Sequence, residues 1–302
     1  MTDARDSTGG SDHSGPHGSG RATGTSHRGR NLALLAVALC VALYAAYASR
    51  RTPVGPQQGA GISWPNDSQP ALKSRFRVAT YNIRRGKGLD GIRDLNRTAN
   101  VLRDADLIGL NEVAGPALWG QADQVEQLAR TLKIGWLFAP NQSRWHKYYF
   151  GNGLLSRLEV GRWTREPLVY NRATTNSHRN RLLAEIVVGS QPITFLVTHI
   201  DRGQIRPVQL QRVLGEFVTH TPAVLVGDFN TTASDPVLVA FFADSNNVDA
   251  IGQVLGTSDD KNRIDWIITR GLKVLSGGLE PPGVSDHPCY WVDVESLAVA
   301  GP

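Results

Sequence analysis

A short apolar run that ends in an acid and an amide is the first place where this sequence could do chemistry. Val224–Val226 is followed by Gly227, Asp228, Phe229 and Asn230, and such a run predicts a buried strand. Residues two apart on a strand point to the same face, so Asp228 and Asn230 should lie side by side at its carboxyl end. There they could hold a phosphate or a metal ion. Taken alone, the motif favours a plain Asx turn.

Five further motifs place an amide, a carboxylate or an imidazole at the end of a predicted strand. Carboxylate, carbonyl and water oxygens are the ligands that Mg²⁺ takes in proteins, usually with few protein ligands and with a substrate phosphate completing the shell. Imidazoles are candidates for proton transfer or for stabilising the charge of a phosphate. The five motifs are Thr80–Ile83, Asn111–Val113, Thr198–Asp201, Arg263–Trp266 and Ser285–His287.

The elements that must position these side chains are mostly strands. Apolar alternation and short apolar runs predict strands over residues 76–83, 106–110, 150–156, 182–188, 193–199, 223–226, 263–268, 272–276 and 288–294. Helical spacing of apolar residues predicts helices over residues 89–103, 121–132 and 205–218. Because strands outnumber helices, we expect two packed sheets with helices outside them.

Composition sets only loose limits on function. The chain has 302 residues, 41% of them hydrophobic and 20% charged, and its net charge is +5, which is ordinary for a soluble domain. This modest charge neither requires nor excludes a nucleic-acid partner. Cys40 lies in an apolar N-terminal run and Cys289 near the other end, so we expect no disulfide within the folded body. No zinc-type spacing of Cys and His is present.

The N-terminal quarter of the chain differs in character from the rest. Residues 1–30 are polar and are expected to be disordered. Residues 31–49 contain the uncharged run 32–48, which predicts a transmembrane anchor or a signal peptide cleaved after Ala48. Residues 50–72 are rich in Pro and Gly and predict a linker. A catalytic domain is expected over 73–296, followed by a tail, 297–302. The anchor and the signal peptide both place the domain outside the cytoplasm, either membrane-anchored or secreted.

Together, the motifs resemble those of the endonuclease/exonuclease/phosphatase superfamily, the DNase I-like metal-dependent phosphoesterases. The resemblance runs from about Arg75 to Val294, and Gly151–Arg157 is similar to a further strand motif of that family. It implies an α/β (α+β) fold, namely a four-layer sandwich of two mixed β-sheets flanked by helices.

The resemblance also implies a role for each site residue. Metal binding, by Mg²⁺ or alternatively Mn²⁺, falls to Glu112 as the principal ligand, with Asn82 and Asp286. The catalytic roles comprise an acid that orients or deprotonates water, an amide that contacts the phosphate, an imidazole with its orienting carboxylate, and a second histidine. The matching residues are Asp228, Asn230, His287, Asp265 and His199.

We therefore expect a Mg²⁺-dependent hydrolase of phosphoester bonds, a phosphodiesterase or endonuclease, that acts as a monomer outside the cytoplasm. Its substrate would be a nucleic acid or a phospholipid, and the membrane contact would be through residues 32–48. The alternatives are a phospholipid or inositide phosphodiesterase or phosphatase, and a non-catalytic binding module on the same fold. The sequence leaves open the roles of Asp201, Arg84, Arg85, Tyr148 and Tyr149.

Overall fold

The computed structural model describes residues 27–65, 68–116, 120–170, 178–189, 191–256 and 261–296. The chain divides into two compact units, Met1–Tyr47 and Ala48–Pro302. The first contains most of helix α1 (His27–Ala48). Within α1, Gly29–Ala48 is 20 residues long with a mean hydropathy of 2.0, long and apolar enough to cross a membrane. The helix begins at His27, inside the segment expected to be disordered; residues 1–26 and the predicted tail lie outside the described residues.

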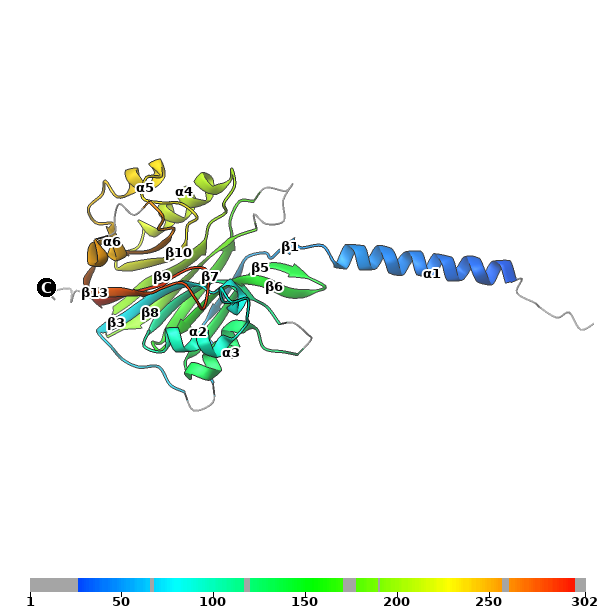
Figure 1. Cartoon of the computed structure of the whole chain (residues 1–302), viewed down its shortest axis with the longest axis horizontal. Coiled ribbons are helices and arrows are strands. Elements are labelled where there is room, and N and C mark those ends of the chain that lie inside the picture. The colour runs from blue at the N-terminus through cyan, green and yellow to red at the C-terminus, as the bar shows by residue number, and fades with distance from the viewer. Residues whose placement is uncertain are drawn as a thin grey trace, which may run out of the picture. The chain divides into compact units, whose positions relative to one another are not determined.

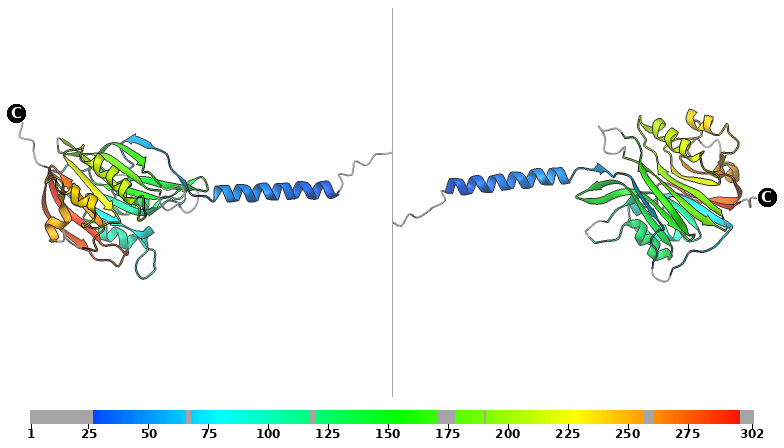
Figure 2. Two further views of the ribbon diagram at one scale, coloured as in Figure 1. Left: turned by 90° about the horizontal axis from the view of Figure 1, so that it is seen from above. Right: turned by 180° about the vertical axis from the view of Figure 1, so that it is seen from behind.

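Two seven-stranded mixed sheets form the second unit, which confirms the predicted fold (Figures 1 and 2). The first sheet has the order β1 (Thr52–Pro53), β5 (Gly135–Arg144), β6 (Lys147–Ser156), β4 (Leu107–Ala114), β3 (Arg75–Asn82), β14 (Cys289–Ser296) and β13 (Leu272–Glu280). The second has the order β11 (Val248–Asp249), β12 (Asp265–Arg270), β10 (Ala223–Asp228), β9 (Gln191–His199), β8 (Asn180–Val188), β7 (Val160–Pro167) and β2 (Gln57–Ala60).

Helices cover the outer faces of both sheets. Helices α2 (Leu95–Leu102) and α3 (Gln124–Leu132) pack on the first sheet. Helices α4 (Arg206–Phe217) and α5 (Pro236–Phe241) pack on the second, and α6 (Ala250–Leu255) lies against β12 and β13. A third apolar cluster fills the space between the two sheets. The layers are therefore helix, sheet, sheet, helix, each pair held by its own buried apolar surface.

Residues 89–94 were predicted to begin a helix, and this prediction is wrong. Helix α2 starts only at Leu95, where the Asp94 side chain accepts a hydrogen bond from the Asn96 amide at 2.8 Å and caps the helix. Leu89 and Ile92, which suggested a longer helix, are 61% and 59% exposed. The apolar spacing extends to the N-terminal side of Asp94, but the apolar residues there have no buried surface to pack against.

The segment predicted as a linker, residues 50–72, contributes edge strands to both sheets. Strand β1 pairs with β5 and strand β2 pairs with β7. The buried guanidinium of Arg165 donates to the carbonyl oxygens of Val54 and Gly55, which satisfies backbone groups that a Pro-rich edge leaves unpaired. The folded unit thus begins at Ala48 rather than at residue 73.

The two sheets approach each other closely where their parallel strand pairs face one another. Strands β3 and β4 are parallel, as are β9 and β10, so their carboxyl ends meet at one edge. Gly109 in β4 makes the approach possible, because a Cβ atom there would lie 2.2 Å from Cγ2 of Val226 on the opposite sheet. The polar strand ends of the two sheets are thereby brought face to face.

Candidate functional site

The predicted site residues lie at neighbouring strand ends. Asp228, the last residue of β10, pairs in register with His199 at the end of β9 and with Asp265 at the start of β12. On the other sheet, Asn82 at the end of β3 pairs with Asn111 of β4. The strand register therefore determines which side chains meet.

Asp228 is the centre of the assembly and is fully buried. Its Oδ2 accepts a hydrogen bond from Nδ2 of Asn82 at 3.0 Å, and its Oδ1 accepts one from the Asn230 amide at 2.9 Å. The same Oδ2 lies 3.4 Å from Nε2 of His199 and 3.8 Å from Nε2 of His287. Burial, together with the neighbouring charge of Asp265, raises the pKa of Asp228 to about 6. Near neutral pH the group is an ionised carboxylate with the basicity of a useful proton acceptor.

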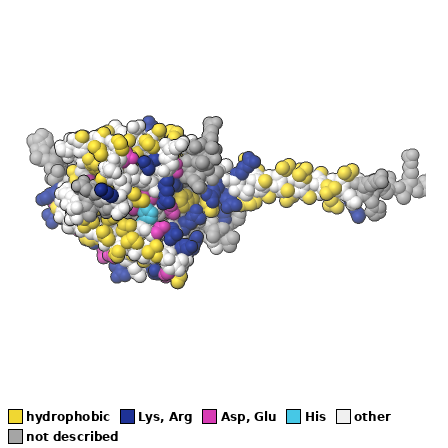
Figure 3. All heavy atoms as spheres, turned by 45° about the horizontal axis from the view of Figure 1, so that its top comes forward, with side chains coloured by type: hydrophobic (Ala, Val, Ile, Leu, Met, Phe, Trp, Pro, Cys, Tyr) yellow, Lys and Arg dark blue, Asp and Glu magenta, His cyan; other side chains and the backbone are white. Residues whose placement is uncertain are grey.

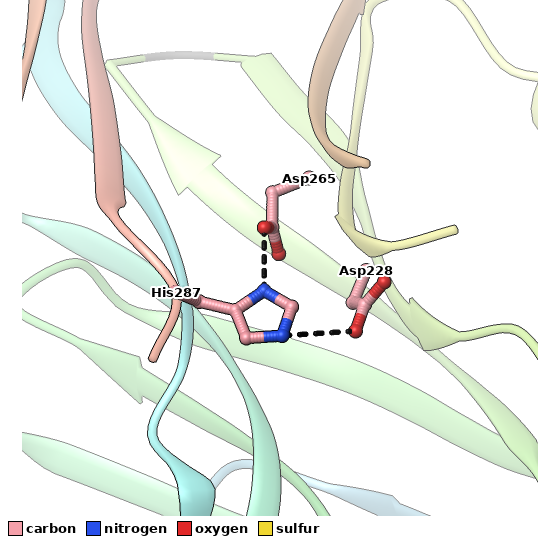
Figure 4. Close-up of side chains that lie close together, drawn as sticks. All are labelled: Asp228, Asp265 and His287. Atoms are coloured by element: carbon pink, nitrogen blue, oxygen red, sulfur yellow. Dashed lines mark hydrogen bonds and ion pairs between the residues drawn. The ribbon is translucent and has the colours of Figure 1, made fainter. Parts of the chain in front are cut away.

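His287 is held between two carboxylates (Figure 4). Its Nδ1 lies 2.7 Å from Oδ2 of Asp265, and its Nε2 faces Asp228. Burial of the ring opposes its charge, but the hydrogen bond to Asp265 and the charges of both carboxylates outweigh burial and raise the pKa of His287 to about 9. The imidazole is therefore a cation at neutral pH, with Nε2–H directed toward Asp228.

His199 is buried at the same site, but its ring is neutral. Burial, and then the positive charges of Arg179, His287 and Arg202, hold its pKa well below the usual range. Its Nε2 lies 3.1 Å from Nδ2 of Asn230, and that amide also donates to the carbonyl of Ile200 at 2.8 Å. Asn230 adopts a left-handed backbone with φ of 50°, which asparagine tolerates better than most residues. Because its ring is neutral, His199 is better suited to contact a phosphate than to give up a proton to it.

The three predicted metal ligands differ in how freely their oxygens are presented. Glu112 has φ of 56°, which turns it out of the path of β4; in the described part of the chain its carboxylate has no hydrogen bond or ion pair. Oδ1 of Asn82 accepts from the Arg84 amide at 3.1 Å, which leaves a lone pair. Oδ2 of Asp286 lies 3.2 Å from Nε of Arg84. A free carboxylate beside an amide oxygen fits the all-oxygen preference of Mg²⁺.

A second group of side chains also has the composition of a metal site. Asp228, Asp265 and His287 each offer a ligand atom within 4.8 Å of the others. Nδ1 of His287 is bonded to Asp265, which leaves Nε2 directed toward Asp228. A carboxylate on one ring nitrogen orients the other nitrogen toward a metal as well as toward a proton. In the metal-free arrangement the ring holds a proton, because the carboxylates raise its pKa to about 9.

A chain of buried asparagines that sequence reasoning missed ties the site to both sheets. Asn111 accepts the Asp228 amide at 2.8 Å and donates to the Thr198 carbonyl at 2.9 Å and to Asn152 at 3.0 Å. Asn152 in turn donates to Asn180 at 2.9 Å. These side chains bond groups on β10 and β9 from β4 and β6, so they fix the distance between the sheets at the site. Asn111 and Asn152 stood in motifs recognised in the sequence, but their pairing with each other and with Asn180, the first residue of β8, carried no sequence signal.

An arginine-lined cleft of about 330 Å³ opens beside Glu112. In Figure 3 a histidine is visible at the surface, with acidic and basic side chains gathered around it. Arg179 was not singled out from the sequence. Burial lowers the pKa of its guanidinium, and the negative charges of Asp201, Glu112 and Asp228 oppose this effect. Its Nε is buried without a partner in the described residues. The cleft is lined by Arg51, Arg85, Glu112, Gln142, Phe150, Arg179, Asp201 and Arg202.

The residues whose roles the sequence left open are divided between this cleft and its surroundings. Arg85 and Asp201 line it, and Arg84 bonds Asp286. The guanidinium groups of Arg51 and Arg85 lie 5.0 and 5.3 Å from the ring centre of Tyr149. Tyr148 is 42% exposed, and its hydroxyl accepts from Gln57 at 2.7 Å. Tyr149 is thus close to the basic groups, whereas Tyr148 contacts the edge strand.

Comparison with known proteins adds to this geometry. The sequence profile of the Endonuclease/Exonuclease/phosphatase family matches residues 79–287. No curated protein sequence matches the chain significantly.

Among solved structures, an endonuclease/exonuclease/phosphatase from Beutenbergia cavernae DSM 12333 is similar, with a TM-score of 0.61 and 23% identity, covering 74% of this chain and 72% of that one. A family protein from Leptotrichia buccalis C-1013-b has a TM-score of 0.57 and 19% identity, covering 73% and 99%. TDP2 of D. rerio, complexed with single strand DNA product, has a TM-score of 0.52 and 18% identity, covering 74% and 100%. These likenesses concern the fold.

Proposed function

Because this chain belongs to the endonuclease/exonuclease/phosphatase family, whose members are phosphoester hydrolases that depend on a divalent metal, we propose that it is a Mg²⁺-dependent phosphodiesterase acting outside the cytoplasm. The single observation that carries the proposal is the pairing of a buried carboxylate, Asp228, with a protonated imidazole, His287, beside an arginine-lined cleft. A non-catalytic module would gain nothing from two buried titratable groups whose pKa values are shifted toward neutral and above it.

In the proposed reaction Asp228 orients a water molecule and accepts its proton. Its buried position keeps it basic enough for this step near neutral pH. Asn82 and the Asn230 amide hold the carboxylate in place through one hydrogen bond to each oxygen. This positioning lets the water attack phosphorus in line with the leaving group, so that geometry and electrostatics supply the rate.

His287 and His199 face the phosphate in different charge states. The His287 cation stabilises negative charge on the phosphoryl oxygens, and Asp265 keeps it charged and fixes its tautomer. Neutral His199, whose Nε2 contacts Nδ2 of Asn230 and lies beside Asp228, provides a further contact for the phosphate. A metal ion held by Glu112, with Asn82 and Asp286 beside it, would polarise a phosphoryl oxygen and shield the leaving group. Asp265 and His287 therefore act as one catalytic unit, and Glu112 acts separately as a metal ligand.

The cleft favours a substrate with more than one anionic group. Four arginines line it, and only two carboxylates, Glu112 and Asp201, share it with them. A phosphodiester with flanking phosphates would satisfy Arg179, whose Nε is buried without a partner in the described residues. One candidate substrate is a nucleic-acid strand, since a structural neighbour is complexed with single strand DNA product. The other is a phospholipid headgroup.

Metal removal tests the proposal directly. We expect hydrolysis of bis-nitrophenyl phosphate to vanish in EDTA and to return with Mg²⁺ or Mn²⁺. Glu112→Gln should weaken metal binding, measured by calorimetry, while the melting temperature of the metal-free protein stays that of the wild type, because the Glu112 carboxylate bonds nothing in the described chain.

Glu295→Gln serves as the matched control, since that acid pairs with Arg75 at the amino end of β3, the end opposite to Asn82. Full activity in EDTA would refute the metal requirement. A loss of metal binding in Asp265→Asn but not in Glu112→Gln would move the metal to the Asp228, Asp265 and His287 group.

The location is proposed from α1. A 20-residue apolar stretch is about 30 Å long, the thickness of the hydrocarbon core. Alkaline phosphatase is active only after export, so its fusion after Ser296 should be active in cells. An inactive but well-expressed fusion would place the domain inside. Retention of the full chain in membranes after a carbonate wash would separate an anchor from a cleaved signal.

A further inference from the structure

The tip of the β5–β6 hairpin is built from residues that do not favour the turn they form. Arg144 and Lys147 pair in register, so Trp145 and His146 form a two-residue loop. Their φ angles are 54° and 58°, the left-handed values that Asn-Gly or Gly-Gly adopt readily and that Trp and His do not. Trp145 is 40% exposed. Turn formation therefore does not explain why these side chains are here.

The same tip is fixed to the chain where it leaves α1. The backbone amide of Trp145 donates to the carbonyl of Ala48 at 2.7 Å. Thr52, four residues after Ala48, pairs with Ser143 of β5, and the hydroxyl groups of the two residues lie 2.7 Å apart. Figure 1 shows β1 running along β5. No free linker separates Ala48 from the hairpin.

This attachment has a consequence if Gly29–Ala48 spans a membrane, which is the anchor in the proposed function on which the inference rests. A span of that length ends at the membrane surface, so Ala48 lies there. Trp145 is one hydrogen bond away from Ala48. Chain connectivity and the contact at Ala48 keep the hairpin tip beside the end of the span, whatever the direction in which the span leaves the domain.

We propose that the hairpin tip, residues 144–147, is a docking surface for anionic phospholipid headgroups. Tryptophan favours the interface between water and hydrocarbon, where its ring is buried and its N–H stays hydrated. Arg50, Arg51, Arg144 and Lys147 supply positive charge close to Ala48, and neither 48–64 nor 133–158 contains an acidic residue. Each basic side chain at an anionic surface raises the ratio of docked to undocked protein about five-fold.

Docking would hold the mouth of the arginine-lined cleft against the headgroups. A second hollow of about 420 Å³ lies next to the tip and is lined by Arg85, Arg144, Trp145, Lys147 and Tyr149, among others. Arg85 lines both this hollow and the cleft beside Glu112. A phosphoester carried by a lipid would thus meet a continuous basic surface between the membrane and the site.

The test places a reporter at the tip of the full chain. His146→Cys in a Cys40→Ala background carries an environment-sensitive dye, since the remaining Cys289 is buried. Lys273→Cys is the matched control, because Lys273 is exposed on β13 at the opposite edge of the same sheet. Both proteins are reconstituted into phosphatidylcholine vesicles, with or without phosphatidylglycerol, that contain a lipid with a nitroxide on its headgroup.

We expect strong quenching of the dye at residue 146, greater with phosphatidylglycerol, and none at residue 273. Adding Trp145→Ser and Lys147→Glu to the reporter protein should abolish the quenching, whereas adding Lys273→Glu should not. Equal quenching at the two positions would overturn the proposal. So would loss of the chain from the vesicles in a carbonate wash, since the anchor would then be absent. Failure of the proposed activity would show separately, as absent hydrolysis of bis-nitrophenyl phosphate with quenching unchanged.

Discussion

Replacing Asp265 by asparagine should disable His287 without touching it. Asp265 accepts the hydrogen bond from Nδ1 of His287 at 2.7 Å and is itself buried. Asparagine keeps the shape but removes the charge and allows the wrong tautomer of the imidazole. We expect kcat to fall about 10²–10⁴-fold, the range for a positioned acid–base group.

The structure sets the size of the electrostatic effect. Raising the pKa of His287 from 6.5 to about 9 corresponds to about 3 kcal/mol in favour of the charged ring. Burial alone would lower this pKa, so the carboxylates must supply more than the net amount. Without Asp265 the ring should be neutral at pH 7, and its cation should no longer be available to the phosphate.

Two measurements test this reasoning. The pKa of His287 is read by NMR of ring-labelled histidine in metal-free protein, with His287→Gln identifying the signal. Hydrolysis rates of Asp265→Asn, His287→Ala and the double variant are compared with those of Asp293→Asn, which removes an acid bonded to Arg77 outside the site. The double variant should be little worse than the worse single one. Multiplying losses, or an unchanged His287 pKa in Asp265→Asn, would refute the unit.

Two further predictions concern stability. Gly109→Ala should destabilise the protein by about 1–3 kcal/mol in urea unfolding, because the new Cβ would lie 2.2 Å from Val226, whereas Gly161→Ala, with its nearest atom at 3.5 Å, should change little; equal effects would contradict the close approach of the sheets. The folded-state pKa of His287, about 9, is above its unfolded value of 6.5, so its stabilisation is complete below pH 6.5 and is lost as pH rises through 9. The unfolding free energy of metal-free wild type minus that of His287→Gln should shrink over this window, and a difference that grows would reverse the assigned charge.

Local patterns were enough to predict the strands that bear the site and the fold they build. The runs before Asn82, Asp228 and His199 are short, apolar and fully enclosed between layers, so each carries its own signal. Strand β5 was missed because Pro140, Asn141 and Gln142 interrupt its apolar character. In the structure the register shifts between Pro140 and Gln142, and a bulge of this kind accommodates a residue without an N–H.

The predicted linker failed for a different reason. Nothing in Thr52–Ala60 is apolar enough to form a strand alone, and its strand conformation depends on partners far along the chain. These partners are β5, β7 and the buried guanidinium of Arg165. An edge strand is thus stabilised by neighbours that sequence periodicity does not contain.

The sequence by itself placed the polar motifs at strand ends, because strand periodicity is a local property. Only the tertiary structure decided their charge states. His199 and His287 are the same residue type, each next to a strand end, yet the first is held neutral and the second charged. Burial, reinforced by the charge of Arg179, keeps the first ring neutral, whereas the hydrogen bond to Asp265 helps to outweigh burial at the second. Asp265 begins a strand of the second sheet and His287 precedes β14 of the first, so they meet only when the two sheets pack.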